Sequence, residues 1–215
     1  MRRVGHVAAA AVAVLTTLAL AGCGEVSPGA AATVDGQAIP LDEVDEVARA
    51  LCTYTQTTAE LQGSPPEQLA TADIRREVLG TRLNAALAEV VSDELGVDVP
   101  PSSYEGGTSQ IEPVLEQMPA AEADVLRDYV DTLGRLRELT AAIGEDRGDS
   151  NVAETPETAI SRGYLLRLAQ GTDIELDPRF GQLRQGRLVG GSGSLSVPAD
   201  AGSRADPPPA SQTCS

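Results

Sequence analysis

Apolar residues recur every three or four positions along most of the chain, whereas shorter segments near both ends alternate apolar and polar residues. The first spacing is typical of helices that bury one face, and the alternation is typical of half-exposed strands. The helical spacing therefore predicts a mainly helical protein. It places helices after Pro40 and over residues 73–95, 111–118, 120–143 and 155–171.

Capping residues and glycines indicate where these helices should begin and end. Asp73 is expected to cap the second helix, because its carboxylate can accept hydrogen bonds from the free N–H groups of the first turn. Gly96 and Gly144 are expected to end the helices that precede them, since glycine readily adopts the left-handed conformation of a C-terminal cap. Pro113 is expected to interrupt the short helix at 111–118, because proline lacks a backbone N–H.

The alternating segments predict short strands near both ends of the chain. Residues 33–39 are expected to form a hairpin, with Asp35-Gly36 as its type I′ turn. Residues 173–177 alternate acidic and apolar side chains, which predicts a strand with one buried face. Residues 177–181 favour a turn, since Asp is preferred at its first position and Pro at its second. Further short strands are expected at residues 187–189 and 195–197.

The N-terminal segment resembles a bacterial lipoprotein signal peptide. Arg2 and Arg3 form a charged start, an apolar run follows, and a Leu-Ala-Gly triplet stands directly before Cys23. The alternative is an uncleaved membrane span, but the apolar run is shorter than the roughly 18 to 20 residues that a span needs. We therefore expect residues 1–22 to be removed and Cys23 to carry a lipid that anchors the protein on the outer side of the cell membrane.

Composition shifts divide the remaining chain into three parts. Residues 23–32 are rich in small side chains and are expected to form a flexible spacer. Residues 33–197 contain the helical and strand patterns and are expected to form one folded domain. Residues 198–215 lack an apolar period and are expected to be a disordered tail, apart from any contact made by Cys214.

Charge and histidine content restrict the partners and the chemistry. Without Arg2 and Arg3 the chain keeps 14 basic residues against 32 acidic ones, so its net charge is 14 minus 32, about −18. Such a surface disfavours nucleic acid as a partner. His6 is the only histidine and would leave with the signal peptide, which removes the commonest general base and the imidazole metal ligands.

The acidic clusters do not indicate a metal site. Neither Glu43, Asp45 and Glu46 nor the acids within 145–149 follow the ligand spacing of a calcium-binding loop. The glycine-rich segment at 190–194 lacks the lysine and the following helix of a phosphate-binding loop. We therefore expect no cofactor, no metal ion and no catalytic residue.

Two cysteines remain once Cys23 is assigned to lipid. Outside the cytoplasm Cys52 and Cys214 could pair, which would attach the C-terminal tail to the first helix. The alternative is two free thiols, with Cys52 buried as a small apolar residue and Cys214 in a disordered tail.

Two motifs together resemble the N-terminal domain of the SurA chaperones and the chaperone core of PrsA-type foldases. The first is Val-Asp-Gly-x-x-Ile followed by Pro-Leu-Asp-Glu-Val-Asp at residues 34–45, and the second is Asp-Pro-Arg-Phe-Gly at 177–181. The resemblance implies an α+β fold, mainly α, in which the first and last strands pair and the helices surround a surface that holds unfolded chains. Nothing in the chain corresponds to the parvulin domain of that family, so we expect no prolyl isomerase activity.

The resemblance implies a lipid-anchored chaperone that binds unfolded or secreted polypeptides without catalysis. An open alternative is a structural or adaptor lipoprotein that binds one native partner at the cell envelope. The candidate client-binding side chains are the large aromatic ones, although packing in the core is the competing interpretation for each. They are Tyr104, Tyr129, Tyr164 and Phe180.

Overall fold

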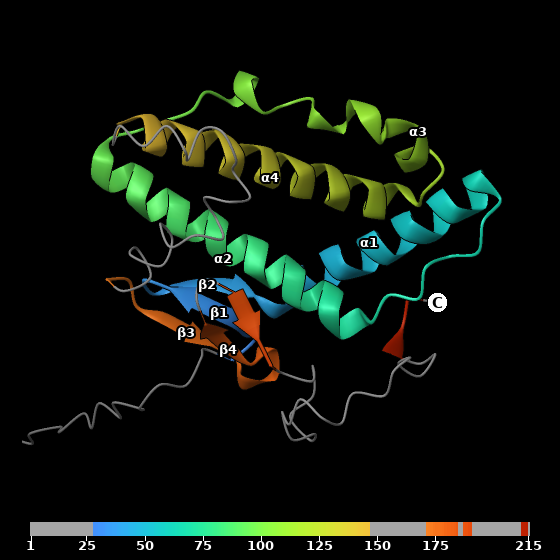
Figure 1. The fold of residues 1–215 in the computed structure, drawn as a ribbon, viewed down its shortest axis with the longest axis horizontal. Coiled ribbons are helices and arrows are strands. Elements are labelled where there is room, and N and C mark those ends of the chain that lie inside the picture. The colour runs from blue at the N-terminus through green and yellow to red at the C-terminus, as the bar shows by residue number, and fades with distance from the viewer. Residues whose placement is uncertain (1–27, 147–170, 185–186, 191–211, 215) are drawn as a thin grey trace, which may run out of the picture.

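The computed structural model describes residues 28–146, 171–184, 187–190 and 212–214 (Figure 1). The helix expected at 155–171 and the strand expected at 195–197 lie outside these residues, apart from residue 171, as does most of the expected tail. The elements are the strands β1 (Ala30–Val34), β2 (Gln37–Pro40), β3 (Ile174–Leu176), β4 (Gln182–Arg184) and β5 (Arg187–Val189), the α-helices α1 (Leu41–Gln62), α2 (Thr71–Leu95), α3 (Glu112–Leu115) and α4 (Ala120–Asp146), and the 3₁₀ turns η1 (Pro101–Ser103), η2 (Gly107–Gln110) and η3 (Pro178–Phe180).

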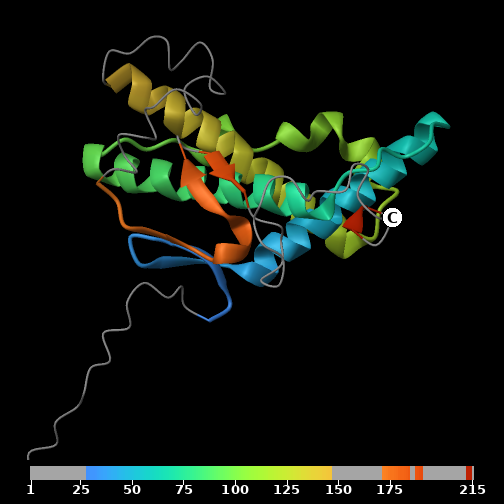
Figure 2. The same ribbon diagram turned by 60° about the horizontal axis from the view of Figure 1, so that its bottom comes forward.

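Three long helices, α1, α2 and α4, form the body of the protein. All three pack against one another, and α2 also packs against β1. Figures 1 and 2 show the small sheet on one side of α2 and α4 on the other. The protein is therefore α+β and mainly α, as predicted. None of the helices in the described ranges is both long and apolar enough to cross a membrane.

The larger sheet joins the two ends of the described fold. Its strand order is β2-β1-β3, and both pairings are antiparallel. Asp35 and Gly36 have φ angles of 50° and 77°, so they form the expected turn between β1 and β2. On the other edge of β1, Val34 pairs with Ile174 and Ala32 pairs with Leu176. The sheet expected from N-terminal and C-terminal segments is thus present.

The chain leaves β3 through the predicted turn. The Asp177 side chain accepts a hydrogen bond from the backbone N–H of Arg179 and so caps η3. A second sheet of two strands follows, in which β4 pairs with β5. β5 matches the strand expected at 187–189, whereas β4 was not predicted because its three residues, Gln-Leu-Arg, are too few to show a period.

The expected spacer at 23–32 ends earlier than predicted. Ala30, Ala31 and Ala32 belong to β1, and Ala31 and Ala32 are 0% exposed. Small residues are common in flexible linkers, but the same small side chains also let a central strand approach a covering helix closely. The composition therefore could not distinguish a flexible linker from a buried strand.

Some expected helix boundaries were confirmed and others were wrong: α1 begins directly after Pro40 and α4 begins at Ala120 as predicted, whereas α3 ends at Leu115 rather than at residue 118. α2 begins one turn earlier than expected, so Asp73 lies in its first turn and Ala70 is the N-cap. Gly96 ends α2 with a left-handed φ of 66°, as predicted. Gly144 does not end α4, which continues to residue 146. Pro113 is the second residue of α3, where the N–H that proline lacks would have had no intrahelical partner, so it does not interrupt the helix.

The core is mainly aliphatic, and the chain contains no tryptophan. Its largest cluster lies where α1 and α2 cover the sheet. It contains side chains of α1, of α2 and of the central strand β1. The members that are at most 2% exposed are Ala31, Ala32, Val34, Val44, Val47, Ala48, Val78, Leu79, Leu83 and Leu87.

A disulfide joins Cys52 of α1 to Cys214, across 162 positions of sequence. Next to it, Thr213 forms a β-bridge with Ala70, and the Cys214 N–H donates to the Leu69 carbonyl at 2.9 Å. Residues 212–214 are therefore attached both to α1 and to the segment that leads into α2. This is the paired alternative of the sequence analysis.

Removing this disulfide should destabilise the fold. In the chain that begins at Gly24, replacing Cys52 and Cys214 together by Ser should lower the free energy of unfolding by about 2–5 kcal/mol, because the unfolded chain loses a very long covalent loop. Urea denaturation followed by circular dichroism measures the change. Reduced wild-type protein is the matched control and should unfold at the same urea concentration as the double variant. Equal stability of the oxidised protein and the double variant would contradict the prediction.

Candidate functional site

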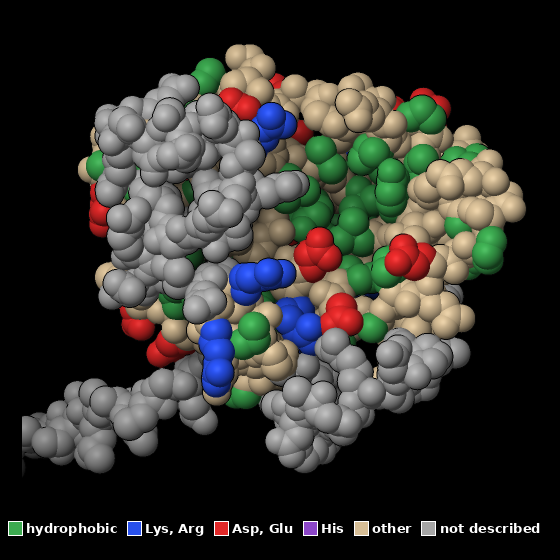
Figure 3. All heavy atoms as spheres, viewed as in Figure 1, with side chains coloured by type: hydrophobic (Ala, Val, Ile, Leu, Met, Phe, Trp, Pro, Cys, Tyr) green, Lys and Arg blue, Asp and Glu red, His purple; other side chains and the backbone are tan. Residues whose placement is uncertain are grey.

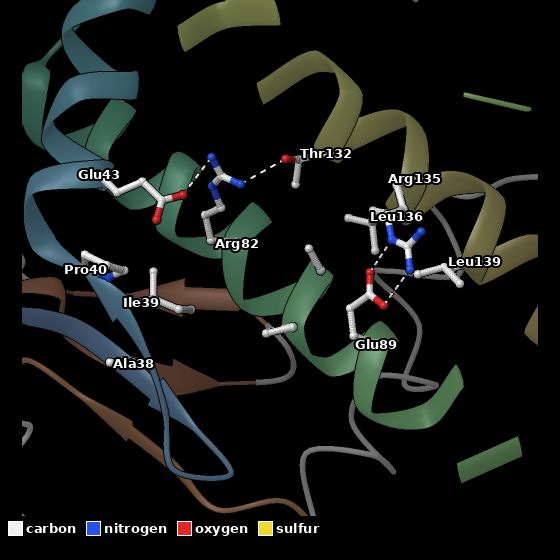
Figure 4. Close-up of a pocket in the computed structure, with 12 residues that line it drawn as sticks. Ala38, Ile39, Pro40, Glu43, Arg82, Glu89, Thr132, Arg135, Leu136 and Leu139 are labelled. Atoms are coloured by element: carbon white, nitrogen blue, oxygen red, sulfur yellow. Dashed lines mark hydrogen bonds and ion pairs between the residues drawn. The ribbon is translucent and has the colours of Figure 1, made fainter. Parts of the chain in front are cut away.

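A cleft of about 290 Å³ opens between β2, α2 and α4. Figure 4 shows α2 running between β2 on one side and α4 on the other. The part of α2 that lines the cleft contributes Ala85 and Ala86, whose short side chains leave space above the helix. Apolar residues of the neighbouring elements, among them Ile39 of β2 and Leu136 and Leu139 of α4, complete the apolar part of the lining.

Arg82 connects three helices at one end of the cleft. Its guanidinium lies 2.8 Å from a carboxylate oxygen of Glu43 on α1 and donates to the Thr132 hydroxyl of α4 at 2.9 Å. Figure 4 shows these two contacts reaching from α2 in opposite directions. The Arg82 guanidinium also lies over the Tyr129 ring, 5.8 Å from its centroid. These contacts fix the spacing between α1, α2 and α4 where the cleft begins.

Arg135 forms the corresponding contact at the other end. Two of its nitrogens donate to the two carboxylate oxygens of Glu89 on α2, at 2.5 and 2.9 Å. The guanidinium also lies 5.9 Å from the centroid of the Tyr104 ring and donates to the Tyr104 hydroxyl at 3.4 Å. Hydrogen bonds to Glu89 and to Tyr104 raise the pKa of Arg135 further above its ordinary value. Arg135 therefore stays positively charged throughout the physiological pH range.

The charges in the cleft cancel. Arg82 faces Glu43 and Arg135 faces Glu89, so two positive charges are balanced by two negative ones. The whole chain, in contrast, has a formal net charge of −16. The cleft is thus an electrically neutral, partly apolar region on a strongly acidic protein.

Apolar side chains also gather on one face of the molecule. Figure 3 shows them at the centre of that face, over the region where α1 approaches α4. In this region a small cluster that contains Ala50 and Leu126 is buried, and Leu51, Tyr54 and Val125 pack against it while remaining partly exposed. Only three large apolar side chains of the described residues are classed as exposed. They are Leu61, Leu133 and Val189.

Two of the four candidate client-binding aromatics belong to the core. Tyr129 is 5% exposed and Phe180 is 3% exposed, so neither can contact a client on the surface. Their assignment to a client surface was wrong. The chain has one phenylalanine, four tyrosines and no tryptophan, and these two of its five large rings fill the interior. Arg75 lies over the Phe180 ring at 5.8 Å from its centroid.

Tyr104 has a different position. It is half-buried beside Arg135 at the α4 side of the cleft, and its backbone and Cβ pack closely against Gly134. Its role in client binding stays a prediction. Tyr164 and Cys23 lie outside the described residues.

No sequence pattern indicated that the charged residues of the cleft come together. Glu43 was considered only as part of an acidic cluster, and Glu89, Arg82 and Arg135 occupy helix positions that look like ordinary solvated surface. Glu43 and Asp45 in fact pair with Arg82 and with Arg75, the second pair at 2.6 Å. Within the described ranges no group of three side chains is arranged to hold a metal ion.

A second groove lies beside the disulfide. Its volume is about 350 Å³, and its lining includes Arg49 and Thr71 together with Cys52 and Cys214. Both cysteines of the disulfide, together with Thr213 beside Cys214, line this groove.

Comparisons of the chain with protein-family models, with curated proteins and with solved structures found no match.

The buried Tyr129 should make stability depend on pH in the alkaline range. Burial raises its pKa above the ordinary value of 10.0, and Glu77 raises it further, while a hydrogen bond with Thr81 and the charge of Arg82 oppose the shift. Because the folded protein keeps a proton that the unfolded chain releases, the free energy of unfolding should fall as pH rises above about 10, until the folded pKa is passed.

This effect is measured by urea denaturation of wild-type protein and of Tyr129→Phe at a series of pH values below and above about 10. The variant should lose part of the alkaline decrease in stability, and absorbance titration of the wild type should show one tyrosine that ionises late. Parallel pH profiles for the two proteins would contradict the assignment.

Proposed function

We propose that this protein is a lipid-anchored, extracytoplasmic chaperone that holds non-native secreted polypeptides and catalyses no reaction. The observation that carries the proposal is the sheet in which β1 pairs with β3, together with the cleft beside it. This pairing of N-terminal and C-terminal strands around a helical body is the arrangement that resemblance to the SurA N-terminal domain implied. The cleft and the apolar region between α1 and α4 offer places where an unfolded chain can bind.

The surface chemistry supports a holding role. A chaperone of this kind needs apolar contacts that accept many sequences, and enough surrounding charge to remain dispersed when loaded. The cleft is neutral and partly apolar, and the chain around it is strongly acidic. A neutral cleft does not select clients by their charge, which suits a protein with many partners.

The location outside the cytoplasm is supported by two independent features. The lipoprotein signal pattern ends at Cys23, and a disulfide between Cys52 and Cys214 is the form expected in an oxidising compartment.

A second candidate is an adaptor lipoprotein that binds one native envelope protein. It is favoured by the small number of large apolar side chains classed as exposed among the described residues, Leu61, Leu133 and Val189. A protein that recognises one folded partner does not need a broad apolar surface.

Lipid attachment is tested at Cys23. Globomycin, which blocks the lipoprotein signal peptidase, should cause the unprocessed form to accumulate, and metabolic labelling with a palmitate analogue should label the wild type. Cys23→Ser should remain unlabelled, and Cys52→Ser is the matched control that should be labelled like the wild type. A wild-type protein that takes up no label and whose migration globomycin does not change would contradict the anchor.

Chaperone activity is tested with full-length protein in lipid nanodiscs. At severalfold molar excess it should slow the aggregation of a chemically denatured test protein, measured by light scattering, because transient binding removes aggregation-prone chains from solution. Empty nanodiscs are the control. Unchanged aggregation would contradict the proposal.

Crosslinking in cells followed by mass spectrometry separates the two candidates. Many secreted proteins among the crosslinked partners support the chaperone. One stoichiometric native partner supports the adaptor instead.

A further inference from the structure

We infer that the cleft binds an extended polypeptide segment as an additional β-strand along the outer edge of β2, which pairs with no other strand among the described residues. This inference rests on the proposed function, because it specifies how a non-native chain would be held. β-Strand addition uses hydrogen bonds of the backbone, which every sequence possesses, so it suits a protein that must accept many clients.

The first argument is the hydrogen-bonding pattern of β2. The strand lies at the edge of the sheet, with β1 on one side. The two-residue turn makes Val34 and Gln37 the closing hydrogen-bonded pair, and bonded pairs alternate with non-bonded pairs along an antiparallel ladder. The backbone N–H and C=O of Ala38 therefore point away from β1.

The exposure of Ala38 agrees with this pattern. Its side chain is exposed, while the next residue, Ile39, is buried. Among the backbone hydrogen bonds that join described residues outside helices and strands, none involves Ala38. Ala38 thus offers one donor and one acceptor at the edge of the cleft, which is what one residue of an added antiparallel strand needs.

The second argument is the shape of the cleft beside this edge. Ala38, Ile39 and Pro40 line it from β2, and α4 lines it from the opposite side of α2 (Figure 4). An added strand would lie about 4.8 Å from β2. Ala85 and Ala86 line the cleft from α2, where longer side chains would fill the space that such a strand needs.

The third argument concerns the side chains of the bound segment. Every second side chain of an added strand would face the cleft lining, where Leu136 and Leu139 offer apolar contact. The pairs Arg82–Glu43 and Arg135–Glu89 bring no net charge to the cleft. The site therefore fits a short, extended, uncharged segment of an unfolded chain. Pro40 has no N–H, so it limits the hydrogen-bonded contact to a few residues.

The test measures binding of a labelled peptide to full-length protein in nanodiscs by fluorescence anisotropy. The probe is an acetylated and amidated Val-Thr repeat of about eight residues, the length of an ordinary strand. A second probe has the same sequence but carries an N-methyl group on every residue, so that neither edge of the bound strand keeps a backbone donor. N-methylation removes hydrogen-bond donors and leaves the apolar side chains unchanged, so it separates strand addition from simple apolar contact.

Two variants alter the site, and a third variant serves as the control. Ala38→Pro removes the edge N–H and places a ring where the added strand would lie. Ala86→Leu fills the cleft and leaves β2 unchanged. Ala121→Leu makes the same change at an exposed position of α4 that does not line the cleft.

We expect Ala38→Pro, Ala86→Leu and the N-methylated probe each to raise Kd about tenfold or more, because each keeps the probe from pairing with β2 and so loses both hydrogen bonds with Ala38. Ala121→Leu should stay within about twofold of the wild type. Circular dichroism and the retained disulfide show whether each variant is folded. If Ala38→Pro does not fold, Ala86→Leu and the N-methylated probe decide the question.

The outcomes separate this inference from the proposed function. If the wild type slows aggregation and the two cleft variants slow it equally well, the β2 site is overturned and the chaperone is not. If the wild type neither binds the peptide nor slows aggregation, both are overturned. A wild-type dimer that becomes monomeric in Ala38→Pro, measured by analytical ultracentrifugation, would assign the edge to a second copy and overturn the inference.

Discussion

The antiparallel pairing of β1 with β3 is the interaction on which the rest of the structure depends. β1 is buried along its whole length, and its two edges are occupied by β2 and by a strand that lies about 140 positions further along the chain. Bringing β3 to β1 requires the helices between them to fold back over the sheet, and α2 then covers the central strand. The position of the cleft follows, because its walls are an edge of this sheet and the helix that packs beyond α2.

Polar contacts, rather than apolar packing alone, keep the cleft open. Arg82 and Arg135 reach from helix to helix at its two ends, while small residues line the space between them. Apolar side chains of the same length would tend to fill that space, since protein interiors pack to high density. Partly exposed ion pairs contribute little to stability, commonly about 0–1 kcal/mol. Their effect here is geometric, because they set the distance between α2 and α4.

The elements that could be predicted were those encoded within a few residues. The Asp35-Gly36 turn and the turn that begins at Asp177 were predicted because each depends on its own side chains and backbone angles. Gly96 and Gly144 show the limit of local reasoning, since glycine permits a helix to end but does not require it. The cleft could not be predicted, because Arg135 and Glu89 lie 46 positions apart and meet only after α2 and α4 have packed.

The early start of β1 has a further consequence for a membrane-anchored protein. Ala30 is already a fixed, buried residue, and it lies seven positions after Cys23. Even a fully stretched chain of that length spans only about 25 Å. If Cys23 bears the anchor, the hairpin must remain closer to the lipid headgroups than the width of one bilayer core. A polypeptide held in the proposed way would then be bound in the layer next to the membrane, before it diffuses into the surrounding medium.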